Sequence, residues 1–309
     1  MSFAFVFPGQ GSQSLGMMQG YAELAVVRDT FREAGEILNQ DLWKLVTEGP
    51  EEALNRTVNT QPLMLVAGAA AYRGWMSLGG AKPVLMAGHS LGEYTALVAA
   101  EAMTLGDALP LVRFRAESMQ HAVPEGTGGI AAILGLDDDV VRQVCAEAAH
   151  NEVLEAANFN SPAQVVIAGH RAAVERGMAL AKSRGAKRAL MLPMSAPSHC
   201  ALMRPAADRL RERLAAVSIR APQIPVLHNA DIREHRNSDE IREALVKQLY
   251  SPVRWVETVR AMASRGITQV AECGPGKVLA GLNKRIDANQ QVLALTDVAA
   301  IRQALTVLA

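Results

Sequence analysis

Short apolar runs separate longer segments of helical periodicity along most of this chain. The runs at 3–7 and 84–88 are continuously apolar and end in glycine-containing turns, which is typical of strands buried in a parallel sheet. Short strands are also predicted at 226–229, 268–272 and 292–295. Because helices are predicted between these runs, the pattern predicts an α/β fold with a mainly parallel sheet.

The helices are predicted from amphipathic or alanine-rich segments that lie between the apolar runs. They are expected at 21–39, 50–55, 60–78, 91–100, 105–122, 198–217, 238–250, 254–265 and 277–285. The segment 60–78 is rich in alanine and contains Gly68, so we expect it to pack closely against its neighbours.

The stretch between residues 125 and 196 follows a different order. Strands are predicted at 129–134, 154–159, 164–168 and 189–193, with helices at 137–149 and 171–184. This βαββαβ order is that of a ferredoxin-like unit. We therefore expect a small ferredoxin-like domain, 125–196, inserted into a larger domain formed by 1–124 and 197–309.

Composition narrows the class of protein. With 309 residues, half of them hydrophobic, the chain can bury a large core, and 31 basic residues balance 31 acidic ones. This balance gives no reason to expect nucleic acid or a membrane surface as a partner. Three scattered cysteines without a C-x-x-C pair indicate neither a disulfide framework nor a thiolate metal site. The sequence shows no signal-peptide pattern and no apolar run of bilayer length, so we expect a cytoplasmic protein.

The segment 84–94 carries the first candidate chemistry. It is an apolar strand, a turn with Gly88-x-Ser90-x-Gly92, and a helix from about Leu91, which is the context of a nucleophile elbow. The glycines remove Cβ atoms where strand and helix crowd together, so Ser90 can take a strained turn with its hydroxyl exposed. The start of the helix aims free N–H groups at a reacting oxygen. By contrast, the glycine-containing loop 8–13 is by itself typical of an ordinary turn.

A serine nucleophile needs a base, and seven histidines compete for that role. His199 lies where the chain returns from the insertion to the main sheet, beside the expected junction of the two domains, so it is the first candidate. His228, at the end of a strand, stays open, whereas His89 should point away from the adjacent Ser90. Asp231 follows a strand but comes after His199, contrary to the usual order of serine, acid and histidine. A backbone carbonyl could orient the imidazole instead.

Seven motifs along the chain, taken together, resemble the malonyl-CoA:acyl carrier protein transacylases of type II fatty acid synthesis. They are FPGQGSQ at 7–13, GHSLGE at 88–93, MQ at 119–120, NFNSP at 158–162, PSHC at 197–200, QLYSPV at 248–253 and GPGKVL at 274–279. The motifs occur in the family's order and cover nearly the whole chain. The resemblance implies an α/β-hydrolase-like catalytic domain with a ferredoxin-like insertion, which agrees with the predicted elements.

The resemblance also implies a set of roles. Ser90 would be the nucleophile and His199 the general base, oriented by the main-chain carbonyl of Gln248. The N–H groups of Gln10 and Leu91 would form the oxyanion hole. The remaining two assignments implied by the family are the malonyl carboxylate site, Arg115, and a pocket-lining residue, Asn160.

The implied reaction moves a malonyl group from malonyl-CoA to the pantetheine thiol of acyl carrier protein through a malonyl-serine. It needs no metal or cofactor beyond the substrate, and coenzyme A is released as a product. We expect a monomer. Alternatives with related chemistry are a discrete polyketide acyltransferase and the transacylase subunit of a malonate decarboxylase. A serine hydrolase and a non-catalytic module that binds carrier protein fit the sequence less well, because Ser90, His199 and Arg115 occur together.

Overall fold

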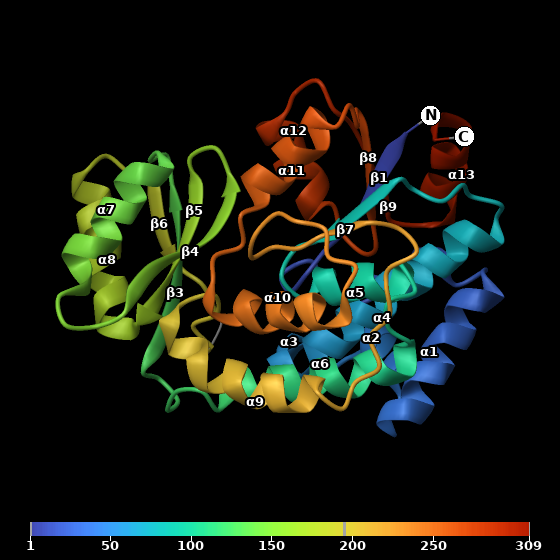
Figure 1. Cartoon of the computed structure of the whole chain (residues 1–309), viewed down its shortest axis with the longest axis horizontal. Helices are drawn as coiled ribbons and strands as arrows, with labels where there is room; N and C mark the ends of the chain where they lie inside the picture. Colours follow the sequence, from blue (N-terminus) through green and yellow to red (C-terminus); the bar gives the residue numbers. More distant parts are fainter. Residues whose placement is uncertain (1, 194–195, 309) are drawn as a thin grey trace.

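The computed structural model describes residues 2–193 and 196–308, whose strands form two sheets (Figure 1). The larger sheet has five parallel strands in the order β7-β2-β1-β8-β9. The strands are β1 Phe3–Phe7, β2 Leu85–Gly88, β7 Val226–Leu227, β8 Gln269–Cys273 and β9 Gln291–Leu295.

Helices connect these strands and cover the sheet. They are α1 Ala25–Leu38, α2 Leu42–Glu48, α3 Glu51–Asn55, α4 Thr57–Ser77, α5 Gly92–Ala99, α6 Leu105–Gln120, α9 Arg204–Leu214, α10 Ser238–Tyr250, α11 Trp255–Ser264, α12 Val278–Ile286 and α13 Val298–Val307. Two 3₁₀ turns, η1 Gln19–Tyr21 and η2 Ala201–Met203, precede α1 and α9.

The central strand β1 is buried on both faces, as its continuous apolar run predicts. Its phenylalanines point to one face, where Phe5 packs edge-to-face on Trp75 of α4 with 5.3 Å between ring centroids. Ala4 and Val6 point to the other face and belong to the hydrophobic cluster that contains residues of α11 and α12. The sheet therefore lies between two apolar layers, and packing on both faces fixes the positions of the strand ends.

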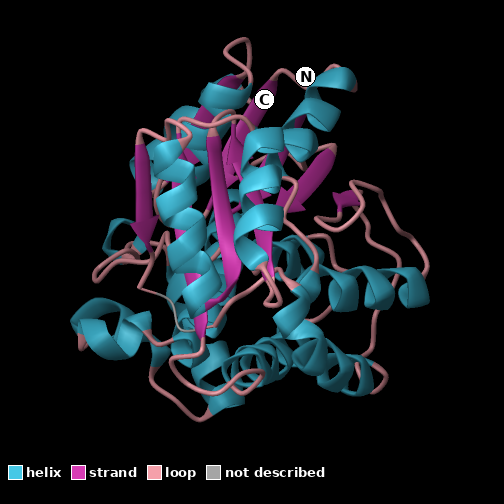
Figure 2. Ribbon diagram, turned by 90° about the vertical axis from the view of Figure 1, so that its left-hand side faces the viewer, coloured by secondary structure: helices cyan, strands magenta, loops and turns pink. Residues whose placement is uncertain are grey.

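The smaller sheet is antiparallel, with the strand order β4-β5-β3-β6. Its strands are β3 Gly128–Leu134, β4 Leu154–Ser161, β5 Gln164–His170 and β6 Arg188–Met191, and its helices are α7 Asp138–Ala149 and α8 Arg171–Ser183. Figure 2, seen from the side of this sheet, shows two helices in front of its strands. The predicted α/β fold, a parallel sheet with a βαββαβ insertion, is confirmed.

Several predicted boundaries were wrong. The helix predicted at 198–217 begins only at Arg204, because His199 takes a positive φ of 63° and donates its N–H to the carbonyl of Leu249 at 2.9 Å. The helix predicted from residue 21 begins at Ala25, after η1. Helices α2 and α13 were not predicted.

The carboxyl ends of β1 and β2 lie side by side, with Phe7 paired to Gly88. The loop 8–13 and the turn at Ser90 therefore leave the sheet at the same edge, which is where open parallel sheets bind their ligands. Within the described part of the chain, no helix combines the length and the apolar character needed to cross a membrane. The same residues contain no group of three or more His, Cys, Asp or Glu side chains arranged as metal ligands.

Candidate active site

Ser90 lies on a sharp turn between β2 and α5, with a positive φ of 51°. A Cβ on Gly88 would lie 1.8 Å from the carbonyl carbon of Gly92. One on Gly92 would lie 2.0 Å from the carbonyl oxygen of Phe7. Neither position has room for a side chain, so the two glycines permit the close strand–helix contact that exposes the serine. The half-buried Ser90 has the backbone of a nucleophile elbow.

The hydroxyl of Ser90 contacts the imidazole of His199. The distance from Ser90 Oγ to His199 Nε2 is 2.8 Å, and His199 Nδ1 donates to the main-chain carbonyl of Gln248 at 2.8 Å. Since the carbonyl can only accept, Nδ1 carries the proton and Nε2 is free to accept from the serine. Burial, and then the positive charge of Arg115, lower the pKa of His199 to about 3. The ring is therefore neutral near pH 7 and can take a proton.

Leu91 directly follows Ser90, and the loop that carries Gln10 packs against the same turn. A Cβ on Gly9 would be 2.4 Å from the carbonyl oxygen of His89 and 3.7 Å from the nitrogen of Leu91, so the loop 8–13 lies against the start of α5. Within residues 2–193 and 196–308, the N–H groups of Gln10 and Leu91 donate to no acceptor. Donors of this kind at a helix start are suited to stabilising a negatively charged oxygen.

Arg115 of α6 is buried, with 1% of its surface exposed, although it carries a charge. Its guanidinium donates to Gln61 Oε1 at 2.6 Å, to Gln248 Oε1 at 3.0 Å and to Ser90 Oγ at 3.3 Å. It also lies 5.4 Å from the ring centroid of Tyr94. Burial lowers the pKa of Arg115, but three neutral acceptors and an aromatic face stabilise the cation. A cation held in this way next to a serine hydroxyl can bind an anionic group of a ligand.

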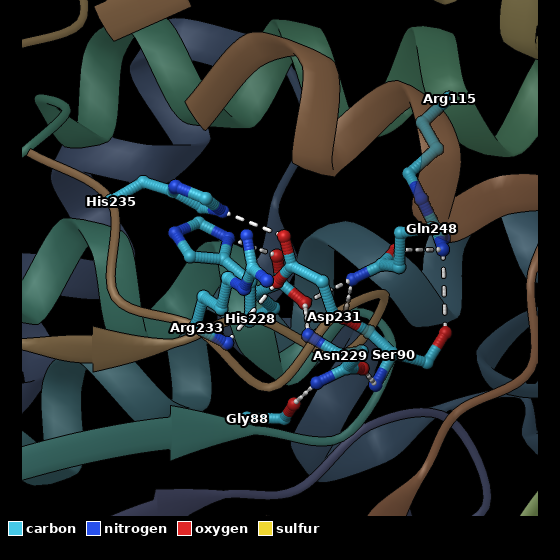
Figure 3. A network of polar contacts seen from close by, with 10 residues as sticks. Gly88, Ser90, Arg115, His228, Asn229, Asp231, Arg233, His235 and Gln248 are labelled. Atoms are coloured by element: carbon cyan, nitrogen blue, oxygen red, sulfur yellow. Dashed lines mark hydrogen bonds and ion pairs between the residues drawn. The ribbon is translucent and has the colours of Figure 1, made fainter. Parts of the chain in front are cut away.

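Asn229 and Glu93 form hydrogen bonds that support the turn at Ser90, and Figure 3 shows Asn229 between Gly88 and Ser90. Asn229 accepts from the N–H of Ser90 at 2.7 Å and donates to the carbonyl of Gly88 at 2.7 Å. The buried carboxylate of Glu93 accepts from the N–H of Asn229 at 2.9 Å and from Gln248 Nε2 at 2.8 Å. Neither residue was predicted from the sequence to belong to the site. Glu93 lies within the GHSLGE motif, and its position in the first turn of the elbow helix was the signal that could have identified it.

Comparisons with known proteins identify the family. A family model described as "Acyl transferase domain" matches residues 4–300. Malonyl CoA-acyl carrier protein transacylase of Escherichia coli is 53% identical over 304 residues, which cover 98% of each chain. The chain belongs to the malonyl CoA-acyl carrier protein transacylase family.

Solved structures agree with this family membership. The acyl-carrier-protein S-malonyltransferase of Burkholderia pseudomallei is 58% identical, with a TM-score of 0.98 and coverage of 99% of this chain and all of the other. A structure described as a type II PKS acyl-carrier protein in complex with its malonyl-transacylase is similar at 50% identity, with a TM-score of 0.98 and coverage of 99% of both chains.

In this member of the transacylase family, His228, His235 and His89 have hydrogen-bond partners other than the Ser90 hydroxyl. His228 is fully buried and donates from Nδ1 to Glu93 at 2.7 Å, and the same carboxylate accepts from Gln248. Asp231 accepts from His235 at 2.9 Å and does not orient His199. His89 donates to Asn160 Oδ1 at 2.8 Å, and its ring lies 5.5 Å from that of Trp255. The structure thus brings Ser90, His199, Arg115 and Gln248 into one network. Asn160 contacts His89, the residue before Ser90 in the chain, and within the described residues no hydrogen bond joins this pair to the network.

Proposed function

We propose that this protein transfers the malonyl group of malonyl-CoA to the pantetheine thiol of acyl carrier protein, in support of fatty acid synthesis. One observation carries the proposal: the Ser90 hydroxyl lies 2.8 Å from a neutral imidazole and 3.3 Å from a buried guanidinium. The first contact suits acyl transfer, and the second suits an acyl group with a distal carboxylate. Membership of the transacylase family supports the same reaction.

In the first half-reaction, His199 Nε2 takes the Ser90 proton as Oγ attacks the thioester carbonyl of malonyl-CoA. The N–H groups of Gln10 and Leu91 donate to the resulting oxyanion. The Gln248 carbonyl, which accepts from Nδ1, stabilises the imidazolium while it holds the proton. When the tetrahedral intermediate collapses, the carbon–sulfur bond breaks and coenzyme A leaves as a thiol with the proton from His199. A malonyl-serine ester remains.

The second half-reaction repeats these steps with a different thiol. His199 deprotonates the pantetheine thiol of the carrier protein, and its sulfur attacks the malonyl ester. The oxyanion again lies on the two N–H groups. Collapse breaks the bond to Ser90 Oγ, which regains its proton from His199. One thioester is exchanged for another, so the reaction is close to neutral in free energy.

Arg115 supplies the preference for malonyl groups. A charged hydrogen bond to the distal carboxylate contributes about 1.5–3 kcal/mol, and a planar guanidinium can make two such bonds. This free energy corresponds to a preference of about ten- to 150-fold over an acetyl group, which has no carboxylate. We propose that Asn160 lines the acyl pocket, where its Oδ1 accepts from His89, the residue before Ser90 in the chain.

The partner that we propose is the acyl carrier protein of fatty acid synthesis, and the alternative is a polyketide carrier protein. Similar proteins such as that of Escherichia coli are named malonyl CoA-acyl carrier protein transacylase, which does not specify the pathway of the carrier. One similar structure is described as a complex of a type II PKS acyl-carrier protein with its malonyl-transacylase. We propose a monomer that works in the cytoplasm. We also propose two domains, 1–124 with 197–309 and 125–196; part of the return connection, 194–195, lies outside the described residues.

Intact-protein mass spectrometry tests the proposal. The protein is incubated with malonyl-CoA, then with fatty-acid or polyketide carrier proteins in their pantetheinylated forms. We expect a malonyl adduct on the enzyme that moves to a carrier, and no adduct on Ser90→Ala. An adduct on Ser90→Ala would place the nucleophile elsewhere. Release of free malonate as fast as transfer would favour a hydrolase, and carrier binding without any adduct would favour a non-catalytic module.

A further inference from the structure

The proposed mechanism gives no task to Glu93, a carboxylate with none of its surface exposed in the first turn of α5. Its two oxygens accept three hydrogen bonds, from His228 Nδ1 at 2.7 Å, from the N–H of Asn229 at 2.9 Å and from Gln248 Nε2 at 2.8 Å. Removing a charge from water is costly, so a carboxylate buried at this depth has to be matched by such donors. The third donor, Gln248, also contacts Arg115, so it connects Glu93 to the residue proposed to bind the malonyl carboxylate.

Glu93 fixes which way the amide of Gln248 points. Gln248 Nε2 has two protons, and it donates one to Glu93 and the other to the carbonyl of Ser90 at 2.9 Å. Its oxygen therefore faces Arg115, from which it accepts at 3.0 Å (Figure 3). A flipped amide would set its oxygen against two acceptors and its NH₂ group against a guanidinium. Without the carboxylate, the amide nitrogen would keep one acceptor, the carbonyl of Ser90, and the guanidinium would be the one remaining group that favours the present orientation of the oxygen.

The connection between Glu93 and Arg115 is indirect. Within the described residues, no carboxylate forms an ion pair with Arg115, and its acceptors are Gln61, Gln248 and the Ser90 hydroxyl. A carboxylate in direct contact would neutralise the cation and compete with an anionic substrate group. Placed behind a neutral amide, Glu93 orients the acceptor for Arg115 and leaves the guanidinium charge available.

We propose that Glu93 is a positioning residue for acyl selectivity: it orients the Gln248 amide, which in turn aims the Arg115 guanidinium at the distal carboxylate of the substrate. The inference rests on the malonyl transfer proposed above. Glu93 touches neither substrate nor reacting atoms. Its loss disturbs the choice of acyl group more than it disturbs the Ser90–His199 pair, since the backbone carbonyl of Gln248 still accepts from His199.

The test compares Glu93→Met with Glu93→Gln, using kcat/KM for malonyl-CoA and acetyl-CoA with carrier protein. Methionine keeps the length but removes the acceptor, so we expect the malonyl preference to fall at least tenfold, mainly through the KM for malonyl-CoA. Glutamine can place its oxygen toward Gln248 and its amide nitrogen toward His228, whose ring changes tautomer. Glu93→Gln should therefore keep the preference within threefold of wild type.

Two further measurements separate this role from general loss of structure. The rate at which phenylmethanesulfonyl fluoride, a neutral probe, labels Ser90 should change less than threefold in Glu93→Met. The matched control is Glu272→Met, since Glu272 is another fully buried carboxylate and accepts from the N–H of Ala280 at 2.8 Å. This control should keep the wild-type preference.

The inference is overturned if Glu93→Met keeps its malonyl preference, or if Ser90 labelling falls as far as the preference does. It is also overturned if Glu93→Gln is as unselective as Glu93→Met, because charge would then matter and not orientation. If Glu93→Met does not fold, Gln248→Met decides, since it removes the amide but keeps the backbone carbonyl; retained preference there would refute the inference. A wild type without malonyl preference would overturn the proposed function together with it.

Discussion

Replacing Arg115 by alanine tests the acyl-selecting part of the site most directly. The guanidinium lies 3.3 Å from Oγ of Ser90, the proposed nucleophile, with 1% of the residue exposed, so little solvent contacts its charge. Loss of a charged hydrogen bond under these conditions costs about 1.5–3 kcal/mol. We therefore expect the ratio of kcat/KM for malonyl-CoA to that for acetyl-CoA to fall about ten- to 150-fold in Arg115→Ala.

The same variant should change the pH dependence of kcat/KM that we expect from the titration of His199. The charge of Arg115 is the second cause, after burial, of the low pKa of His199, which is about 3. Without that charge the pKa of His199 rises, so the acidic limb of the kcat/KM profile moves to higher pH. Acetyl-CoA is the substrate for this measurement, because it has no carboxyl group that titrates in the same range.

The assay is transfer to carrier protein from each thioester at several pH values. The control is Arg113→Ala, because Arg113 lies two residues away on the same helix and donates to the carbonyl of Leu38 and the side chain of Gln40. It should behave as wild type. An unchanged malonyl-to-acetyl ratio in Arg115→Ala would refute the role of the guanidinium. An acidic limb that stays in place or moves to lower pH would refute its electrostatic effect on His199.

Two other predictions concern the fold that holds the site. Gly92→Ala should lose several kcal/mol of stability or fail to fold, since its Cβ would lie 2.0 Å from a backbone oxygen. Thermal melting compares it with Gly281→Ala, a position with open space around the added Cβ. Equal melting temperatures of the two variants would contradict the prediction. Burial raises the pKa of Glu272 from 4.5 to about 7, so the folded state binds more protons and stability falls as pH rises between these values. Glu272→Gln should remove about 3 kcal/mol of this dependence in urea titrations; an unchanged slope against pH would contradict it.

The sequence by itself determined the local parts of this protein. Apolar runs and glycines near each other in the chain predicted the parallel sheet, the βαββαβ insertion and the elbow at Ser90, because backbone sterics and side-chain periodicity act over a few residues. The same reasoning missed α2 and α13. It also started a helix at Ser198, where a long-range hydrogen bond to Leu249 holds His199 in a left-handed conformation.

The candidate roles of Gln248, Gln10 and Arg115 came from the resemblance to the transacylase family and not from the spacing of residues along the chain. Arg115 and Gln61 are separated by 54 residues and Gln248 and Glu93 by 155, and no pattern along the chain relates them. Only the tertiary structure decided that they form one network. Packing of distant helices around the ends of β1 and β2 brings these side chains together, and burial then requires each polar group to find its partner there.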